Sequence, residues 1–97
     1  MEIRLNKSAL TDLSKIFNTI YMDKPTVATE YVTKIQTYIH LLETNSKMGK
    51  ECKYKNIEHN CRVMYYDNYR IIYRIVNEKL IRILKINNTK QNNKGKK

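Results

Sequence analysis

Two arginines in the segment Tyr69–Val76 are the residues best suited to do chemistry in this chain of 97 residues. The segment is rich in β-branched and aromatic residues and is therefore predicted to be a β-strand. Because successive side chains of a strand point to opposite faces, Arg70, Ile72 and Arg74 share one face, which is half apolar and half cationic. Such a face suits neither a protein core nor a plain solvated surface. We therefore predict that it meets a negatively charged group, such as a phosphate or a carboxylate.

The basic residues also have ordinary structural interpretations. Arg70 could form an exposed ion pair with Glu78 or Asp67, and such pairs contribute little to stability. Lys53 and Lys55 flank a tyrosine, a pattern that could hold single-stranded RNA, but lysines also protect edge strands from aggregation. Both interpretations stay open at this point. The tyrosines best placed to contact a partner are Tyr65, Tyr66 and Tyr69.

The cysteines and histidines form no recognisable metal site. Cys52, Cys61, His40 and His59 match no common spacing of zinc ligands, so we predict neither a metal nor a cofactor. The sequence begins Met-Glu-Ile-Arg-Leu with no apolar run, so no signal peptide is predicted, and no segment is long enough to span a membrane. We therefore expect a cytoplasmic protein with no membrane partner, in which both cysteines are reduced thiols.

The composition indicates one small, strongly basic domain. Hydrophobic residues make up 41% of the chain and charged residues 29%, which is typical of a folded domain and not of a disordered chain. The formal net charge of +10 predicts an acidic partner: a nucleic acid, an anionic membrane surface or an acidic protein. A chain rich in lysine and asparagine could also owe part of this charge to codon usage.

The first half of the chain predicts a short strand followed by two helices. Residues Glu2–Asn6 alternate like a strand, and Ser8 is predicted to cap the first helix, with Asp12 in its first turn. Pro25 marks the start of the second helix, because proline is tolerated in the first turn of a helix and not in its interior. The apolar residues at helical spacing are Leu10, Leu13, Ile16, Phe17 and Ile20 in the first helix, and Ala28, Tyr31, Ile35, Tyr38, Ile39 and Leu42 in the second.

After Gly49 the apolar pattern changes from helical to strand-like. A weak strand candidate and three better ones follow, at residues 53–57, 61–66, 69–76 and 80–86. The pairs Asp67-Asn68 and Asn77-Glu78 are predicted to be the turns between the last three strands. Residues 1–91 thus form one domain, and the polar, basic residues 92–97 are predicted to be a flexible tail.

One face of this sheet must be covered by the helices, because an apolar sheet face needs a partner layer. We therefore predict an α+β fold, in which a short strand is followed by a two-helix hairpin packed on a three- or four-stranded antiparallel sheet (βααβββ). With a turn at Asn77-Glu78, the residues facing the helices are Ile71, Tyr73, Ile75, Leu80, Arg82, Leu84 and Ile86, and those facing away are Arg70, Ile72, Arg74, Ile81, Ile83 and Lys85.

Several short pieces occur in an order and spacing that are typical of one family. They are Ala9-x-x-Asp12-Leu13-x-x-Ile16, Pro25-x-x-Ala28, Leu42 with Met48-Gly49, Arg62, Tyr69–Ile75 and Ile81–Ile86. In this combination the chain resembles a toxin of the RelE/ParE superfamily from bacterial type II toxin–antitoxin systems, over nearly all of residues 2–91. The resemblance implies the fold predicted above and a protein partner, the co-encoded antitoxin that neutralises the toxin.

The resemblance also implies a choice between two targets. ParE-like members inhibit DNA gyrase, whereas RelE-like members enter the ribosome and cut mRNA. In a RelE-like enzyme Arg62, Arg70 and Lys90 would stabilise the scissile phosphate, but many relatives have a histidine where this chain has Asn88, and asparagine cannot transfer protons.

The long helical hairpin also resembles the ParE-like group, so we predict a gyrase-binding toxin. An mRNA endonuclease, or an inactive member that only binds its antitoxin, is the alternative. The candidate residues for binding the target or nucleic acid are Lys53, Lys55, Arg62, Tyr66, Arg70, Arg74, Lys85 and Lys90.

Overall fold

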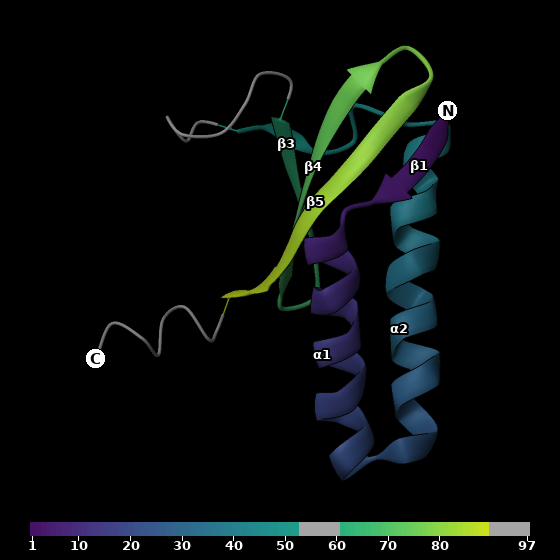
Figure 1. Ribbon diagram of the computed structural model, residues 1–97, viewed down its shortest axis with the longest axis vertical. Coiled ribbons are helices and arrows are strands. Elements are labelled where there is room, and N and C mark those ends of the chain that lie inside the picture. Colours follow the sequence, from purple (N-terminus) through teal and green to yellow (C-terminus); the bar gives the residue numbers. More distant parts are fainter. Residues whose placement is uncertain (53–60, 90–97) are drawn as a thin grey trace, which may run out of the picture.

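The computed structural model describes residues 1–52 and 61–89 and confirms the predicted α+β fold, with two helices side by side against a twisted sheet (Figure 1). The sheet has the strand order β1-β5-β4-β3-β2. The elements are β1 (Glu2–Leu5), α1 (Lys7–Asp23), α2 (Pro25–His40), the 3-10 turn η1 (Leu41–Glu43), β2 (Lys50–Glu51), β3 (Cys61–Tyr66), β4 (Tyr69–Asn77) and β5 (Leu80–Asn88).

The sheet has five strands and is mixed, whereas the sequence predicted three or four antiparallel strands behind a separate first strand. β1 pairs with β5 in parallel, from Glu2 opposite Leu80 to Leu5 opposite Ile83. At the other edge, the two-residue strand β2 pairs with β3. The pairing of β1 joins two ends of the chain that are far apart in sequence, so no local pattern could predict it. The strand expected at residues 53–57 lies outside the described residues.

The sequence predicted the start of α2 correctly but not the residue that caps α1. Pro25 is the first residue of α2, as expected from its fixed φ and missing N–H. The prediction of Ser8 as the cap of α1 is wrong, because the helix already begins at Lys7 and Asn6 takes the cap position. Ser8 and Asp12 are instead turned toward β5, as described below.

The core lies between the helices and the inner face of the sheet, where apolar side chains from both layers meet. Its largest fully buried side chains are Ile35, Ile39, Leu42, Ile71, Tyr73, Ile81 and Ile83. Three residues expected in the core, Phe17, Tyr31 and Tyr38, are only half-buried. Tyr73 is the one of these core side chains with a polar group, and its hydroxyl donates to the carbonyl oxygen of Ser46 (2.8 Å) and accepts from the Gly49 N–H (2.8 Å). This link fixes the segment between η1 and β2 against the centre of the sheet.

The register of β5 differs from the prediction by one residue. Asn77 pairs with Leu80, so the turn residues are Glu78 and Lys79, and the Asn77 side chain accepts a hydrogen bond from the Lys79 N–H (2.7 Å). The pairing then shifts between Ile75 and Asn77, which leaves Val76 as an extra residue of β4. A one-residue shift turns the side chains that follow on β5 to the other face. Consequently Ile81 and Ile83 are buried, and Arg82 is exposed on the outer face.

A second irregularity in the pairing of β4 with β5 returns the end of β5 to the predicted orientation. The register shifts between Ile72 and Tyr73, which leaves Leu84 as an extra residue of β5. As a result Ile86 lies opposite Ile71 and is 4% exposed, in the core where the sequence placed it.

The expectation of free thiols is wrong, because Cys52 and Cys61 form a disulfide. The bond joins the residue after β2 to the first residue of β3, where the Cys52 N–H also donates to the Cys61 carbonyl oxygen (2.9 Å). Because Glu51 lies opposite Arg62, the next pair outward on the two strands is Cys52 and Cys61. The sequence could not predict this proximity, since it put the strand at 53–57 and not at 50–51.

Candidate target-binding face

The outer face of the sheet, turned away from the helices, carries the arginines singled out by the sequence. Ile71 and Tyr73 of β4 are fully buried against the helices, so alternation turns Arg70, Ile72 and Arg74 outward, as predicted. Arg70 lies opposite Tyr65 of β3 on one side and opposite Asn87 of β5 on the other. The outer face therefore combines guanidinium groups with an exposed phenol and an amide.

Arg70 has an unusual environment for a strand arginine. Its Nε atom is buried and has no hydrogen-bond partner, and no acidic side chain pairs with Arg70 in the part of the chain that the structure describes. The ion pairs with Glu78 or Asp67 that the sequence allowed are not formed. A buried polar nitrogen without a partner costs stability, which is typical of a group kept for a ligand.

Arg62 does not join Arg70, because it lies on the opposite face of the sheet. Arg62 is directly opposite Tyr73 and 17% exposed, and its guanidinium donates to the Gly49 carbonyl oxygen (2.5 Å). The carboxylate of Glu51 lies 4.0 Å from the same group. Together with the two hydrogen bonds of the Tyr73 hydroxyl, this contact holds Gly49 in position. Arg62 is thus part of the fold of this segment, and its prediction as a target-binding or catalytic residue is not supported by its position.

Tyr66 is also turned inward and is half-buried in an aromatic cluster. Its ring centroid lies 5.2 Å from that of Tyr38 and 6.1 Å from that of Tyr31. Tyr31 donates a hydrogen bond to the Asp67 carboxylate (2.7 Å), and burial together with this carboxylate raises the pKa of Tyr31. The tyrosine of β3 that lies on the outer face is therefore Tyr65, which is 54% exposed and opposite Arg70.

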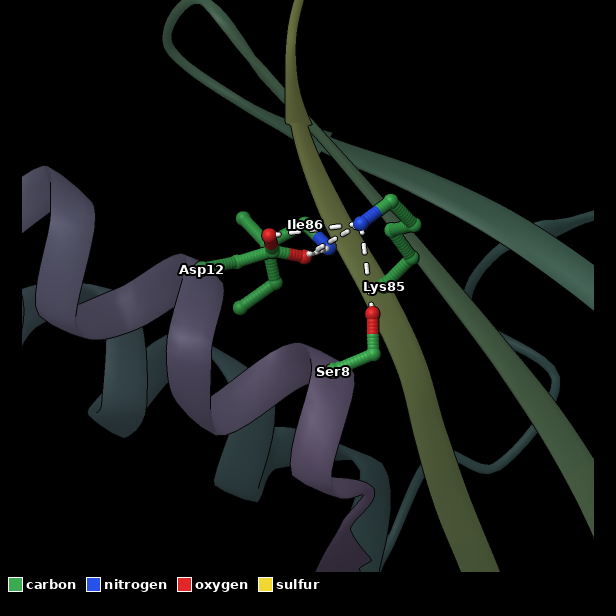
Figure 2. Close-up of polar contacts among 4 residues, drawn as sticks. All are labelled: Ser8, Asp12, Lys85 and Ile86. Carbon is green, nitrogen blue, oxygen red and sulfur yellow. Dashed lines mark hydrogen bonds and ion pairs between the residues drawn. The ribbon is translucent and has the colours of Figure 1, made fainter.

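Lys85 is held in a link between β5 and α1 (Figure 2). Its Nζ atom lies 3.3 Å from both carboxylate oxygens of Asp12 and 3.2 Å from the Ser8 hydroxyl. The same carboxylate accepts a hydrogen bond from the Ile86 N–H (2.8 Å). Lys85 therefore contacts α1 within the protein, and Asp12 stabilises the contact between α1 and β5. The sequence predicted only that Asp12 lies in the first turn of α1, where its charge would complement the helix dipole.

Three further candidates lie outside the described residues, namely Lys53, Lys55 and Lys90. Conversely, two arginines that the sequence did not select lie on the outer face. Arg82 of β5 lies opposite Arg74, and Arg4 of β1 lies opposite Arg82. The signal that could have found them is the strand register, which the alternation of side chains alone does not fix.

The described residues contain no cluster of three or more His, Cys, Asp or Glu side chains that could hold a metal ion. Among these residues, no helix is both long enough and apolar enough to cross a membrane.

Comparison with known proteins gives one family and several structures of the same fold. Residues 3–93 match the family described as the ParE toxin of the type II toxin–antitoxin system parDE. Among solved structures, the chromosomal ParDE TA system from P. aeruginosa matches with a TM-score of 0.76 and 20% identity, over 91% of this chain and 95% of that chain. A comparison with curated proteins gives no significant match.

A second solved structure has the same fold. The toxin–antitoxin complex RelBE2 from Mycobacterium tuberculosis matches with a TM-score of 0.62 and 19% identity, over 89% of this chain and 94% of that chain. At this identity the structures confirm the fold, while the family match spans almost the whole chain and confirms the expected resemblance. The protein is therefore a member of the ParE toxin family of type II toxin–antitoxin systems.

Proposed function

We propose that this protein stops bacterial growth by binding DNA gyrase in the cytoplasm, without cutting RNA, and that a co-encoded antitoxin neutralises it. Membership of the ParE toxin family supports the toxin role. The observation that carries the choice of a binding inhibitor is the orientation of Arg62. A ribosome-dependent nuclease of this superfamily would need that cation beside Arg70, but the two arginines lie on opposite faces of the sheet.

The lack of a proton-transfer group at position 88 supports the same choice. Asn88 stands where a nuclease of this superfamily would carry histidine, and its side chain forms a hydrogen bond with the Tyr69 hydroxyl. A side-chain amide is neither protonated nor deprotonated near neutral pH, so this position supplies neither a general acid nor a general base. A binding inhibitor needs no such group.

One observation favours the alternative of an mRNA endonuclease. Tyr65 is 54% exposed, lies opposite Arg70 on the outer face, and carries a hydroxyl that could donate a proton to a leaving group. Arg70 would then stabilise the charge of the phosphate. We rank this function second, because two of the three cations expected at the phosphate do not support it: Arg62 faces the other side of the sheet, and Lys90 lies outside the described residues.

Charge supports the antitoxin as a partner. The chain carries a formal net charge of +10, so an acidic or amphipathic segment of a partner would be attracted to it over several ångströms. Both structural relatives named above are described as toxin–antitoxin systems or complexes. The proposal therefore includes a complex in which the antitoxin covers basic surface of the toxin.

Transcript mapping tests whether the protein is a nuclease. Induced wild-type protein, Arg70→Ala and Tyr65→Phe would be compared for growth arrest and for new 5′ ends in cellular RNA. We expect growth arrest by the wild-type protein and no new ends within translated messages. New ends that depend on Arg70 and Tyr65 would contradict the proposal and establish the endonuclease.

A further inference from the structure

β1 forms a free edge of the sheet. It is the last strand in the order β1-β5-β4-β3-β2 and lies at one side of the sheet in Figure 1. The Glu2 N–H donates to the Lys79 carbonyl oxygen (2.8 Å), so Glu2 directs its backbone groups toward β5. Because these groups alternate along a strand, Ile3 and Leu5 direct their N–H and C=O groups away from β5. Among the described residues these groups have no hydrogen-bond partner, which leaves them to water or to another strand.

This edge lacks most of the devices that prevent pairing between molecules. Such devices include proline, bulges, very short strands and charges of one sign, especially lysine. At the other edge of the sheet, β2 is only two residues long. β1 has neither proline nor lysine, and its pairing with β5 is continuous from Glu2 to Leu5. Its two charged residues, Glu2 and Arg4, have opposite signs, so they do not repel a strand that carries the same two charges in reverse order.

Both charged side chains are accessible to a partner. The Glu2 carboxylate lies 2.6 Å from Arg4 Nε, and the two side chains are 56% and 67% exposed. An exposed ion pair of this kind contributes little to stability. The contact between Glu2 and Arg4 therefore does not prevent either side chain from pairing across the edge.

The first five residues are complementary to themselves in the antiparallel direction. When Ile3 lies opposite Ile3 of a second copy, Glu2 lies opposite Arg4 on both sides of the two-fold axis. The outer pair is then Met1 with Leu5, which are both apolar. Every pair in this register is favourable, because opposite charges and apolar side chains directly across from each other stabilise a sheet.

The backbone selects the same register as the side chains. Ile3 directs both its N–H and its C=O to the free edge, so two Ile3 residues can exchange two hydrogen bonds across the two-fold axis. Glu2 and Arg4 then occupy a non-hydrogen-bonded pair, the position at which facing side chains are closest.

We propose that two copies of this chain pair through β1 in antiparallel orientation and join their sheets into one continuous sheet. This inference goes beyond the proposed function and does not depend on the target of the toxin. A two-fold axis gives each Glu2 an Arg4 opposite it without any further complementarity, which is the arrangement of an isologous dimer. Addition of a strand to a sheet edge draws its affinity mainly from the backbone hydrogen bonds. Because the strand is short, the interface is small and the dimer is expected to be weak.

The test is sedimentation equilibrium of the purified, antitoxin-free toxin with its native N-terminus, at concentrations up to about 200 µM. Salt at about 0.15 M gives a Debye length of about 8 Å and so screens the net charge of +10 that each copy carries. We expect the average mass to rise with concentration toward twice that of the monomer. A mass that stays that of the monomer over the whole range would overturn the proposal.

Charge reversal identifies β1 as the interface. Glu2→Lys places the introduced lysine opposite Arg4 of the other copy at two positions, and Arg4→Glu brings two carboxylates together in the same way. Each variant alone should dimerise roughly 10-fold more weakly or worse, because two attractive pairs become repulsive. An equal mixture of the two variants should associate at least as tightly as the wild-type protein, since every cross-strand pair then has opposite charges.

Matched controls make the same two charge changes away from β1. Asp23→Lys and Lys24→Glu lie in the exposed turn between α1 and α2, at the far end of the helices from β1 (Figure 1). Alone or mixed, they should dimerise within about threefold of the wild-type protein, because distant charges are screened. Thermal unfolding of every variant checks that it is folded. Equal effects of the β1 variants and the controls would contradict the proposal, and so would a mixture of the β1 variants that does not associate.

Hydrogen exchange of single amides provides an independent measurement of the interface. Protection of the Ile3 and Leu5 amides should rise with protein concentration, while that of Glu51 on the other edge strand should not. Ile3 and Leu5 amides that become protected only when the antitoxin is added would assign this edge to the antitoxin and overturn the dimer. Since none of these measurements involves gyrase, failure of the dimer would leave the proposed function unaffected.

Discussion

Replacing Asp12 by alanine is expected to lower the free energy of unfolding by about 2–3 kcal/mol, since a hydrogen bond to a charged group contributes about 1.5–3 kcal/mol. β1 ends at Leu5, opposite Ile83, so beyond this point β5 has no neighbouring strand on that side. The Asp12 carboxylate takes the place of such a strand by accepting the Ile86 N–H (2.8 Å) (Figure 2). The side chain of Asp12 is only 12% exposed, so water replaces it poorly.

The Lys85 ion pair adds less to this effect than the backbone contact does. Lys85 Nζ lies 3.3 Å from Asp12 Oδ1, but its own side chain is 47% exposed, and exposed ion pairs contribute little. Lys85→Gln should therefore cost less than about 1 kcal/mol. Asp12→Asn keeps an acceptor for the Ile86 N–H, so its loss of unfolding free energy should lie between those of Asp12→Ala and Lys85→Gln.

Denaturant unfolding of the three variants measures this prediction, and hydrogen exchange of the Ile86 amide reports on the contact itself. In the wild-type protein this amide should exchange slowly, and in Asp12→Ala its protection should fall more than that of Ile81, which lies where β1 still covers β5. Equal stability of Asp12→Ala and the wild-type protein would show that α1 does not hold this edge through its carboxylate.

Replacing Tyr73 by phenylalanine is expected to cost about 2–4 kcal/mol, because two backbone groups lose a buried partner at about 1–3 kcal/mol each. The Tyr73 side chain is fully buried at the centre of the sheet, and its hydroxyl links the Ser46 carbonyl to the Gly49 N–H. Gly49 is packed tightly here, since a Cβ at this position would lie 2.7 Å from the Val63 carbonyl oxygen and 2.9 Å from the Tyr73 ring. Only glycine therefore fits between β3 and the Tyr73 ring.

Tyr38→Phe is the matched control for this substitution. Tyr38 is half-buried, and its hydroxyl has no hydrogen bond within the part of the chain that the structure describes. We expect the control to change the free energy of unfolding by less than about 0.5 kcal/mol. Similar midpoints of denaturation for Tyr73→Phe and the wild-type protein would refute the structural role of the hydroxyl.

The sequence predicted the features that depend on local periodicity and missed those that depend on register. The helical hairpin, the start of α2 at Pro25 and the outward orientation of Arg70 follow from residue spacing alone, and the structure has them. The orientation of Arg82 depends on an extra residue of β4, Val76, next to the turn between β4 and β5. The pairing of β4 with β5 shifts by one residue between Ile75 and Asn77, and this shift turns Arg82 outward. A turn signal such as Asn77-Glu78 does not specify whether a strand beside it carries an extra residue.

The missed contacts share a second cause, namely that their partners lie far apart in the sequence. Asp12 meets Ile86 across 74 positions, and Arg4 meets Arg82 through the parallel pairing of β1 with β5. Arg62 was expected to be functional because of its charge and its place in the family resemblance. Its structural role follows from the strand pairing, which puts Arg62 opposite Tyr73 and beside Gly49.

The central claim is that the protein inhibits gyrase by binding, and a supercoiling assay with purified gyrase tests it most directly. Relaxed plasmid, ATP and gyrase would be incubated with increasing amounts of the toxin, free of its antitoxin and then with it. We predict loss of supercoiling as the toxin reaches the concentration of gyrase, and recovery when the antitoxin is added. Full supercoiling at a large excess of folded toxin, which still arrests growth when it is induced in cells, would contradict the claim.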